Sequence, residues 1–285
     1  MEEYILLILA IKNSEDSWLL KTTTRAVTAT KLKKDKLKNK KTEIIILDHH
    51  EIPPQEDIPD NVTMIHPHLF NAREELASSA LCYLFAKTLD EENKDLATLA
   101  IIGMIGDMLE KHKDKTYSKI LKDAEVTIKT GLLLYPATRP IDRVLENSFG
   151  FYIPEVTGSY KGVLDLLREA GLEKSSKGYK SLAELTDEEM SNLTTAIMLK
   201  KTDNSTPKES DSIGNIYLIN FFNRLEDARE ISALINACSR MDPPEIALGF
   251  CLENKALKEQ AEKIAQILIS NKMIREGSNS LETKK

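Results

Sequence analysis

The sequence predicts an α/β fold: a parallel sheet first, then a helical section, then a smaller α/β domain. Three observations support this prediction. Short aliphatic runs at 5–9 and 44–47 are typical of strands that are covered on both faces. Residues around 119–200 look helical and are rich in charge. After the polar segment 203–211, strand-like and helix-like segments alternate, which favours a second α/β domain.

The composition fits this class and limits the setting. The 285 residues are 41% hydrophobic and 29% charged, enough to bury a core. A net charge of -6 excludes a uniformly basic coat for nucleic acid but leaves room for a local basic groove. Three widely spaced cysteines make neither a zinc pattern nor a disulfide framework, so we expect a reducing, cytoplasmic setting. No apolar run approaches the ~18 residues of a membrane span, so we expect no membrane partner.

The first part of the chain predicts three strands. Tyr4–Ile11 follows two glutamates without a basic flank, so it is predicted as a strand and not as a signal peptide. The lysine-rich stretch Lys31–Lys41 is interpreted as a solvated helix or loop, with a phosphate-contacting strip as the alternative. Ile44–Leu47 is the strongest strand candidate. A proline-marked loop and a further strand at Val62–Ile65 follow it.

Two helices are predicted next, at Arg73–Leu89 and Leu96–Leu109. The second is apolar nearly all round and is therefore expected to be buried. Its Gly103 and Gly106 weaken a helix but let other backbone come close. Further on, Thr186–Glu189 has the pattern of a capping box, which predicts the start of another helix.

The carboxyl-terminal part predicts the order strand, helix, strand, helix. The strands are placed at Ile213–Phe222 and Ile246–Cys251, and the helices at Leu225–Cys238 and Lys255–Lys272. The predicted organisation is a first domain, a helical connecting section, a linker, a carboxyl-terminal domain and a disordered tail, at 1–135, 136–202, 203–211, 212–275 and 276–285.

Residues that ligate metals are concentrated in the first half. Asp48, His49 and His50 follow the strand Ile44–Leu47, and ligands of open α/β sheets bind at the carboxyl ends of strands. Carboxylate with imidazole suits manganese, zinc or iron. The alternative is a polar strand end with ordinary hydrogen bonds. Asp107 ends an apolar, glycine-bearing helix, where a metal or an exposed helix end would satisfy it.

The motif LDHH, followed at this distance by GxxGD, resembles the DHH phosphoesterase superfamily. The finer resemblance is to its archaeal RecJ-like branch, which includes nucleases associated with the GINS replication complex. It covers roughly residues 42–272 and is carried by HPHLFNAREELASSALCYLFAK, TRPIDRVLENSFGFYIPEVTGS, LAELTDEEM and EDAREISALINACSRMDPPEIALGF.

The resemblance implies a phosphodiesterase of DNA replication or repair that degrades single-stranded DNA with two metal ions, usually Mn²⁺. The family takes its ligands from four motifs. Asp48, His49, His50 and Asp107 match the last two and are the implied catalytic and metal-binding residues.

The first two motifs are not found. Before Asp48 the only aspartates are Asp16 and Asp35, and the strand Tyr4–Ile11 is not followed by the expected aspartate. We therefore expect that the first strand-helix unit is missing and that the partial site holds one weakly bound ion or none. Three functions stay open. They are a scaffold that binds GINS-like proteins and single-stranded DNA, a split exonuclease completed by a separate amino-terminal RecJ fragment, and an enzyme acting on small nucleotides or oligoribonucleotides.

The carboxyl-terminal domain resembles the DHH-associated domain, which grips the nucleic-acid strand. Arg229, Asn236 and Arg240 match its DAREISALINACSR signature and are the implied nucleic-acid-binding residues. For Arg229 the alternative is a helical ion pair with Glu226 or Glu230.

Three further sites depart from the family or are ambiguous. His66 and His68 flank Pro67 and are expected to be hydrogen-bonding loop residues more than metal ligands. The stretch Ser78–Leu81 replaces a glycine-containing turn of the family, and Ser239 stands where glycine is common.

Overall fold

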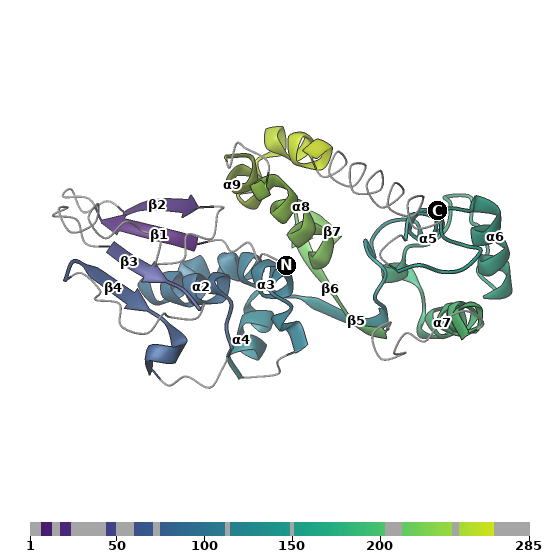
Figure 1. Cartoon of the computed structure of the whole chain (residues 1–285), viewed down its shortest axis with the longest axis horizontal. Helices are drawn as coiled ribbons and strands as arrows, with labels where there is room; N and C mark the ends of the chain where they lie inside the picture. Colours follow the sequence, from purple (N-terminus) through teal and green to yellow (C-terminus); the bar gives the residue numbers. More distant parts are fainter. Residues whose placement is uncertain are drawn as a thin grey trace, which may run out of the picture. The chain divides into compact units, whose positions relative to one another are not determined.

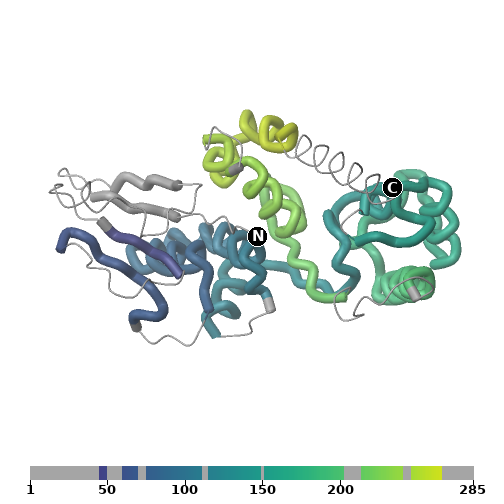
Figure 2. The backbone as a smooth tube through the Cα atoms, in the orientation of Figure 1, coloured from purple at the N-terminus to yellow at the C-terminus, as the bar shows by residue number. Residues whose placement is uncertain are grey.

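The computed structural model describes most of the chain after the first third (Figure 2). The described residues are 7–12, 18–23, 44–49, 60–70, 75–111, 115–148, 151–202, 213–240 and 245–264. The chain forms two compact units. Unit 1 combines Met1–Glu125 with Ile231–Lys285, and unit 2 is Val126–Glu230.

Unit 1 contains a four-stranded sheet in the order β2-β1-β3-β4 (Figure 1). Its strands are β1 (Leu7–Lys12), β2 (Trp18–Thr23), β3 (Ile44–Leu47) and β4 (Val62–Ile65). Only β3 and β4 are parallel, with Leu47 opposite Ile65, while β1 is antiparallel to both β2 and β3. The strands predicted at these places are confirmed, but β2 was missed. It follows β1 after five residues, and so short a connection joins only antiparallel strands.

Two long helices of unit 1 pack beside the sheet and against each other. They are α2 (Ser78–Leu89) and α3 (Ala97–Gly106), and α2 lies against β1 and β3. The prediction that the second helix is buried is confirmed: most of α3, from Ala97 to Ile105, is buried. Gly103 explains how closely the helices approach, because a Cβ there would lie 2.2 Å from Oγ of Ser79 on α2.

Short elements complete the described part of unit 1. The 3₁₀ turns η2 (Pro67–Phe70), η3 (Glu91–Leu96) and η4 (Leu109–Lys111) alternate with the helices, and α4 (Lys115–Asp123) follows. After the return of the chain, α9 (Glu245–Cys251) and a helix at 255–264 lie in the same unit.

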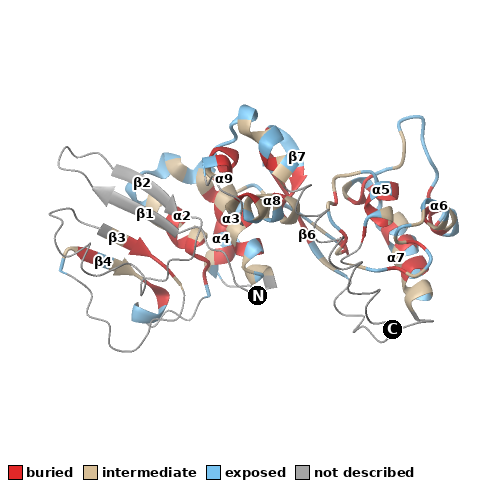
Figure 3. Cartoon of the chain, turned by 45° about the horizontal axis from the view of Figure 1, so that its top comes forward, coloured by how far each residue is buried: buried red, intermediate tan, exposed pale blue. Residues whose placement is uncertain are grey.

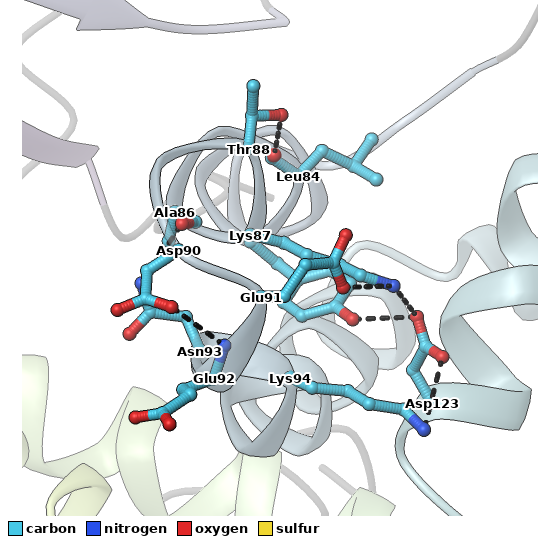
Figure 4. Close-up of polar contacts among 11 residues, drawn as sticks. Leu84, Ala86, Lys87, Thr88, Asp90, Glu91, Glu92, Asn93, Lys94 and Asp123 are labelled. Atoms are coloured by element: carbon cyan, nitrogen blue, oxygen red, sulfur yellow. Dashed lines mark hydrogen bonds and ion pairs between the residues drawn. The ribbon is translucent and has the colours of Figure 1, made fainter.

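A polar cluster fastens α4 to α2 (Figure 4). The carboxylate of Asp123, at the end of α4, accepts hydrogen bonds from Oη of Tyr83 and Nζ of Lys87, both at 2.8 Å. Lys94 Nζ lies 3.8 Å from the same carboxylate. The hydrogen bond from Lys87 lowers the pKa of Asp123, and burial raises the pKa of Tyr83. We interpret this cluster as a structural contact that stabilises the packing of α4 against α2, since each of these groups has a partner inside it.

Unit 2 contains a three-stranded antiparallel sheet, β5-β6-β7, formed by β5 (Thr127–Leu132), β6 (Ile213–Phe221) and β7 (Arg224–Asp227). The turn between β6 and β7 has only two residues, and both have positive φ (53° at Phe222 and 55° at Asn223), as such hairpins require. Phe222 tolerates this because its ring is buried edge-on against Phe221.

Helices α5 (Ile141–Glu146), α6 (Tyr160–Glu169) and α7 (Asp187–Thr202), with the turn η5 (Leu182–Glu184), build the core of unit 2 with the sheet (Figure 3). The capping box predicted before α7 is confirmed. Thr186 N–H donates to Glu189 at 2.8 Å, and Glu189 N–H donates to the Thr186 hydroxyl at 3.2 Å.

Three predicted elements are wrong. The stretch around 119–200 is not all helical, because β5 lies within it. Most of the first residues of β5 are exposed, so the strand lacks a clear pattern of alternating apolar residues. Ile246–Cys251 is helical, as α9, because a short apolar run does not distinguish strand from helix. The helix predicted from Leu225 begins only at Ala228, as α8 (Ala228–Arg240), since its first residues form β7.

After the linker, the observed order is therefore strand, strand and then helices, instead of an alternation. The helices predicted at 73–89 and 96–109 are confirmed with later starts and, for the second, an earlier end. The predicted linker and tail lie outside the described residues, and the predicted domain boundaries stay a prediction. Among the residues that the structure describes, no helix is long and apolar enough to cross a membrane.

Candidate functional site

Asp48 lies where the parallel strands of unit 1 end. It follows the buried residues Ile46 and Leu47 of β3 and is itself only 6% exposed. Its N–H donates to the carbonyl oxygen of Ile65 at the end of β4 at 3.2 Å, so the pairing with β4 extends one residue beyond β3. The carboxylate therefore stands at the carboxyl end of a parallel pair, as predicted.

The Asp48 carboxylate is held by its own strand and by α2. Oδ1 accepts from the N–H of His49 at 2.8 Å and from the hydroxyl of Ser78 at 3.4 Å. Ser78 is fully buried and begins α2, whose amino-terminal end favours negative charge. Ser78 lies in the stretch that replaces the family's glycine turn, and sequence reasoning gave it no role.

Asp107 comes to the same place from α3. It is the C-cap residue of that helix, and its N–H donates to the carbonyl oxygen of Gly103 at 3.0 Å. Its Oδ2 lies 3.7 Å from Nε2 of His49. The structure thus brings together Asp48, His49 and Asp107 from two motifs that are far apart in the sequence.

The glycines of the GxxGD motif let α3 pack closely against neighbouring helices. A Cβ at Gly106 would lie 2.6 Å from Oγ of Ser232 on α8, so only glycine lets the end of α3 approach that helix. Together with Gly103 against Ser79, this places the Asp107 end of α3 between α2 and α8. The prediction that these glycines allow close approach is confirmed, whereas the contribution of Ser232 was not predicted.

His66 follows β4 at the same edge of the sheet. It is buried, and its Nδ1 accepts from the N–H of His68 at 3.2 Å. The two rings meet edge to face with centroids 5.3 Å apart. The expectation that this pair makes loop hydrogen bonds is confirmed.

The donor set for a metal is incomplete in what the structure describes. Asp48, His49 and Asp107 would be the groups to hold an ion, but no three His, Cys, Asp or Glu side chains among the described residues converge as a ligand set. The remaining predicted ligand, His50, lies outside the described residues. The described residues therefore do not fit the implied pair of Mn²⁺ ions.

Arg229, the first predicted nucleic-acid contact, is engaged within unit 2. Its Nε and one terminal nitrogen donate to the carboxylate of Asp227 at 3.1 and 2.7 Å, and that carboxylate is fully buried. Arg229 therefore does form an ion pair, but the alternative that named Glu226 or Glu230 as its partner is wrong, because the acid is Asp227. Glu226 and Glu230 lie within 3.4 Å of Arg139 instead.

The other two predicted contacts lie further along α8. Asn236 is exposed, and its carbonyl oxygen accepts from the Ser239 hydroxyl at 2.9 Å. Arg240 is the last residue of α8, and its side chain is outside the described part. Cys238 is buried, as expected, and burial raises the pKa of its thiol to about 11.

Comparison with known proteins supports the resemblance in part. Residues 134–213 match the family model of the DHH-CID domain, and this region lies inside unit 2. An uncharacterized protein of Methanocaldococcus jannaschii is 29% identical over 231 residues, which cover 74% of this chain. The match spans only 46% of that relative's length. The chain is therefore similar to the DHH-CID domain over residues 134–213 and has a distant archaeal relative.

Proposed function

We propose that this chain is a RecJ-like DHH protein of DNA replication or repair that binds single-stranded DNA and a GINS-like partner as a scaffold. On this proposal it is not a competent nuclease by itself. The DHH-CID match and the DHH and GxxGD motifs support the family part of the proposal.

One observation carries the scaffold part: the site has few anionic ligands. The two recognised motifs supply two carboxylates, Asp48 and Asp107, and Oδ1 of Asp48 already accepts two hydrogen bonds. Two divalent ions bring four positive charges, and the strand predicted at Tyr4–Ile11 is not followed by an aspartate that could balance them. Ligand number and charge control the affinity of such sites, so we expect at most one weakly held ion.

The test uses 5′-labelled single-stranded DNA and the purified chain with Mn²⁺. We expect binding without degradation, and at most one Mn²⁺ per chain by elemental analysis. Degradation that disappears in Asp48→Ala, but persists in the exposed control Asp95→Ala, would overturn the scaffold proposal. So would two Mn²⁺ per chain.

The partner is tested separately with a purified GINS complex in size-exclusion chromatography. Co-elution that survives Asp48→Ala supports a scaffold, because binding then does not depend on the site. Separate elution of the two proteins would remove the GINS-like partner from the proposal and leave DNA binding standing.

One observation favours an alternative. His49 links the two motifs, because its N–H donates to Asp48 and its Nε2 lies 3.7 Å from Oδ2 of Asp107. An enzyme completed by a separate amino-terminal RecJ fragment would need the two motifs to meet in this way. On this alternative, Mn²⁺-dependent 5′-exonuclease activity appears only after addition of a polypeptide whose strand ends in Asp-x-Asp. Asp48→Ala then abolishes that activity.

A further inference from the structure

An exposed aromatic ring stands on an anchored loop of unit 2. The loop Leu134–Arg139, called here the Tyr135 loop, follows β5. Tyr135 is 57% exposed, although Leu134 and Ala137 on either side of it are buried in the core. The ring therefore projects from a segment that is fixed by its neighbours.

A buried ion pair fixes this loop on both sides of the ring. Asp227 accepts from the N–H of Ala137 at 2.9 Å, and it also accepts both hydrogen bonds of Arg229. Arg229 donates in turn to the carbonyl oxygen of Leu134 at 3.4 Å. A ring that is held in place before binding loses little conformational entropy when a ligand stacks on it.

The same arginine lies against the ring. The guanidinium carbon of Arg229 is 5.8 Å from the centroid of Tyr135, within the range of a cation–π contact. Since Asp227 and Leu134 already engage Arg229, its role is to position the ring. The ring remains more than half exposed, as a stacking surface for a nucleic-acid base must be.

A cation for the phosphate backbone belongs to the same loop. The Arg139 side chain is 42% exposed, whereas its partners Glu226 and Glu230 are 3% and 19% exposed. The guanidinium of Arg139 is therefore the most solvent-exposed charged group of this cluster. Burial also raises the pKa of Glu230.

We propose that the Tyr135 loop is a contact site for single-stranded nucleic acid, with Tyr135 stacking on a base and Arg139 meeting a phosphate. Arg229 is the positioning residue beneath the ring. This inference rests on the proposed single-strand binding and assigns part of that binding to unit 2, outside the predicted residues Asn236 and Arg240.

The first test measures fluorescence anisotropy with a labelled 20-nucleotide oligothymidine. Loss of one stacked base costs about 1–3 kcal/mol, which corresponds to roughly 5- to 150-fold weaker binding by Tyr135→Ala. Tyr135→Phe keeps the ring and should bind as the wild type does. Tyr152→Ala is the matched control, because Tyr152 is 62% exposed in the same unit. Circular dichroism checks that each variant is folded.

A second measurement separates stacking from charge. An oligonucleotide carrying 2-aminopurine loses fluorescence when its base stacks, and this signal should disappear in Tyr135→Ala. Arg229→Lys should reduce it, because lysine keeps the charge but not the two-pronged hold on Asp227. Arg139→Ala should instead lower the slope of log affinity against log salt by about 0.7, the value for one phosphate contact on a single strand.

The outcomes distinguish this inference from the function on which it rests. If the wild type binds no single strand, both are overturned. If the wild type binds and Tyr135→Ala binds equally well, only the Tyr135 loop assignment is overturned. If Tyr135→Ala loses the GINS-like partner but keeps DNA binding, the loop is a protein interface and the inference is wrong.

Discussion

At the scale of single residues, the side chains of the motifs could be predicted from the sequence, but the residues that hydrogen-bond to them could not. Asp48 and Asp107 were assigned to one site from the family resemblance, and the structure brings them together through His49. Ser78 could not be found in this way, because a buried serine has no distinctive sequence pattern. The acid that pairs with Arg229 was also missed, since helical spacing pointed to Glu226 or Glu230 and Asp227 precedes the helix.

The Asp123 cluster makes a pH-dependent contribution to stability. The hydrogen bond from Lys87 lowers the pKa of Asp123 below the ordinary value of about 3.9, so the folded state binds fewer protons there than the unfolded state. This stabilisation is complete above about pH 4 and is lost as the pH falls through the lowered pKa.

We therefore expect Asp123→Asn to lower Tm by about 2–4 °C at pH 7, the shift produced by about 1 kcal/mol of lost hydrogen bonding in a chain of this size. The difference should shrink as the pH falls below about 4. Calorimetry at several pH values checks this, with the exposed Asp95→Asn as control. A difference that stays constant into acid would show that the charge of Asp123 does not matter.

At the scale of elements, the strongly patterned segments were predicted and the short or half-exposed ones were not. The buried helix α3 and the capping box before α7 have clear signals in the sequence and are confirmed. β5 was missed because its first half is exposed, and α9 was assigned to a strand because seven residues do not fix a period.

The α2–α3 crossing gives a test at this scale. Alanine at position 103 gains about 1 kcal/mol in helix propensity but overpacks the crossing, which costs about 1–3 kcal/mol. Because the added carbon would lie 2.2 Å from Ser79 Oγ, we expect overpacking to prevail and Gly103→Ala to be destabilised by about 1–2 kcal/mol.

Urea unfolding measures this, and Ser79→Gly provides both the control and the rescue. It removes the two atoms within 2.5 Å of the added carbon, so the double variant should lose less stability than the two single variants together. Strict additivity would mean that the two helices separate freely to admit the methyl group.

At the scale of the whole molecule, the sequence predicted two α/β parts but not the path of the chain between them. Composition predicts a linker at 203–211 from its polar and breaker residues, but the two compact units divide at Glu125 and Glu230 instead. The return of the chain to unit 1 at Ile231 depends on packing between distant segments, such as Gly106 against Ser232. No local pattern indicates such a contact.

Unit 2 should fold without the rest of the chain. It is continuous from Val126 to Glu230, has its own core and contains the whole DHH-CID match. We expect the fragment 126–230 to unfold in one cooperative thermal transition by circular dichroism. A fragment without a cooperative transition would show that unit 1 is needed to complete its core.

The path of the chain also sets an order of assembly on the ribosome. Ser232, which meets the end of α3 beside Asp107, is translated only after all of unit 2. While unit 2 is being synthesised, the Asp107 end of α3 therefore lacks the contact with Ser232. Asp107 therefore follows a helix end whose packing partner is made much later, although Asp107 itself emerges early.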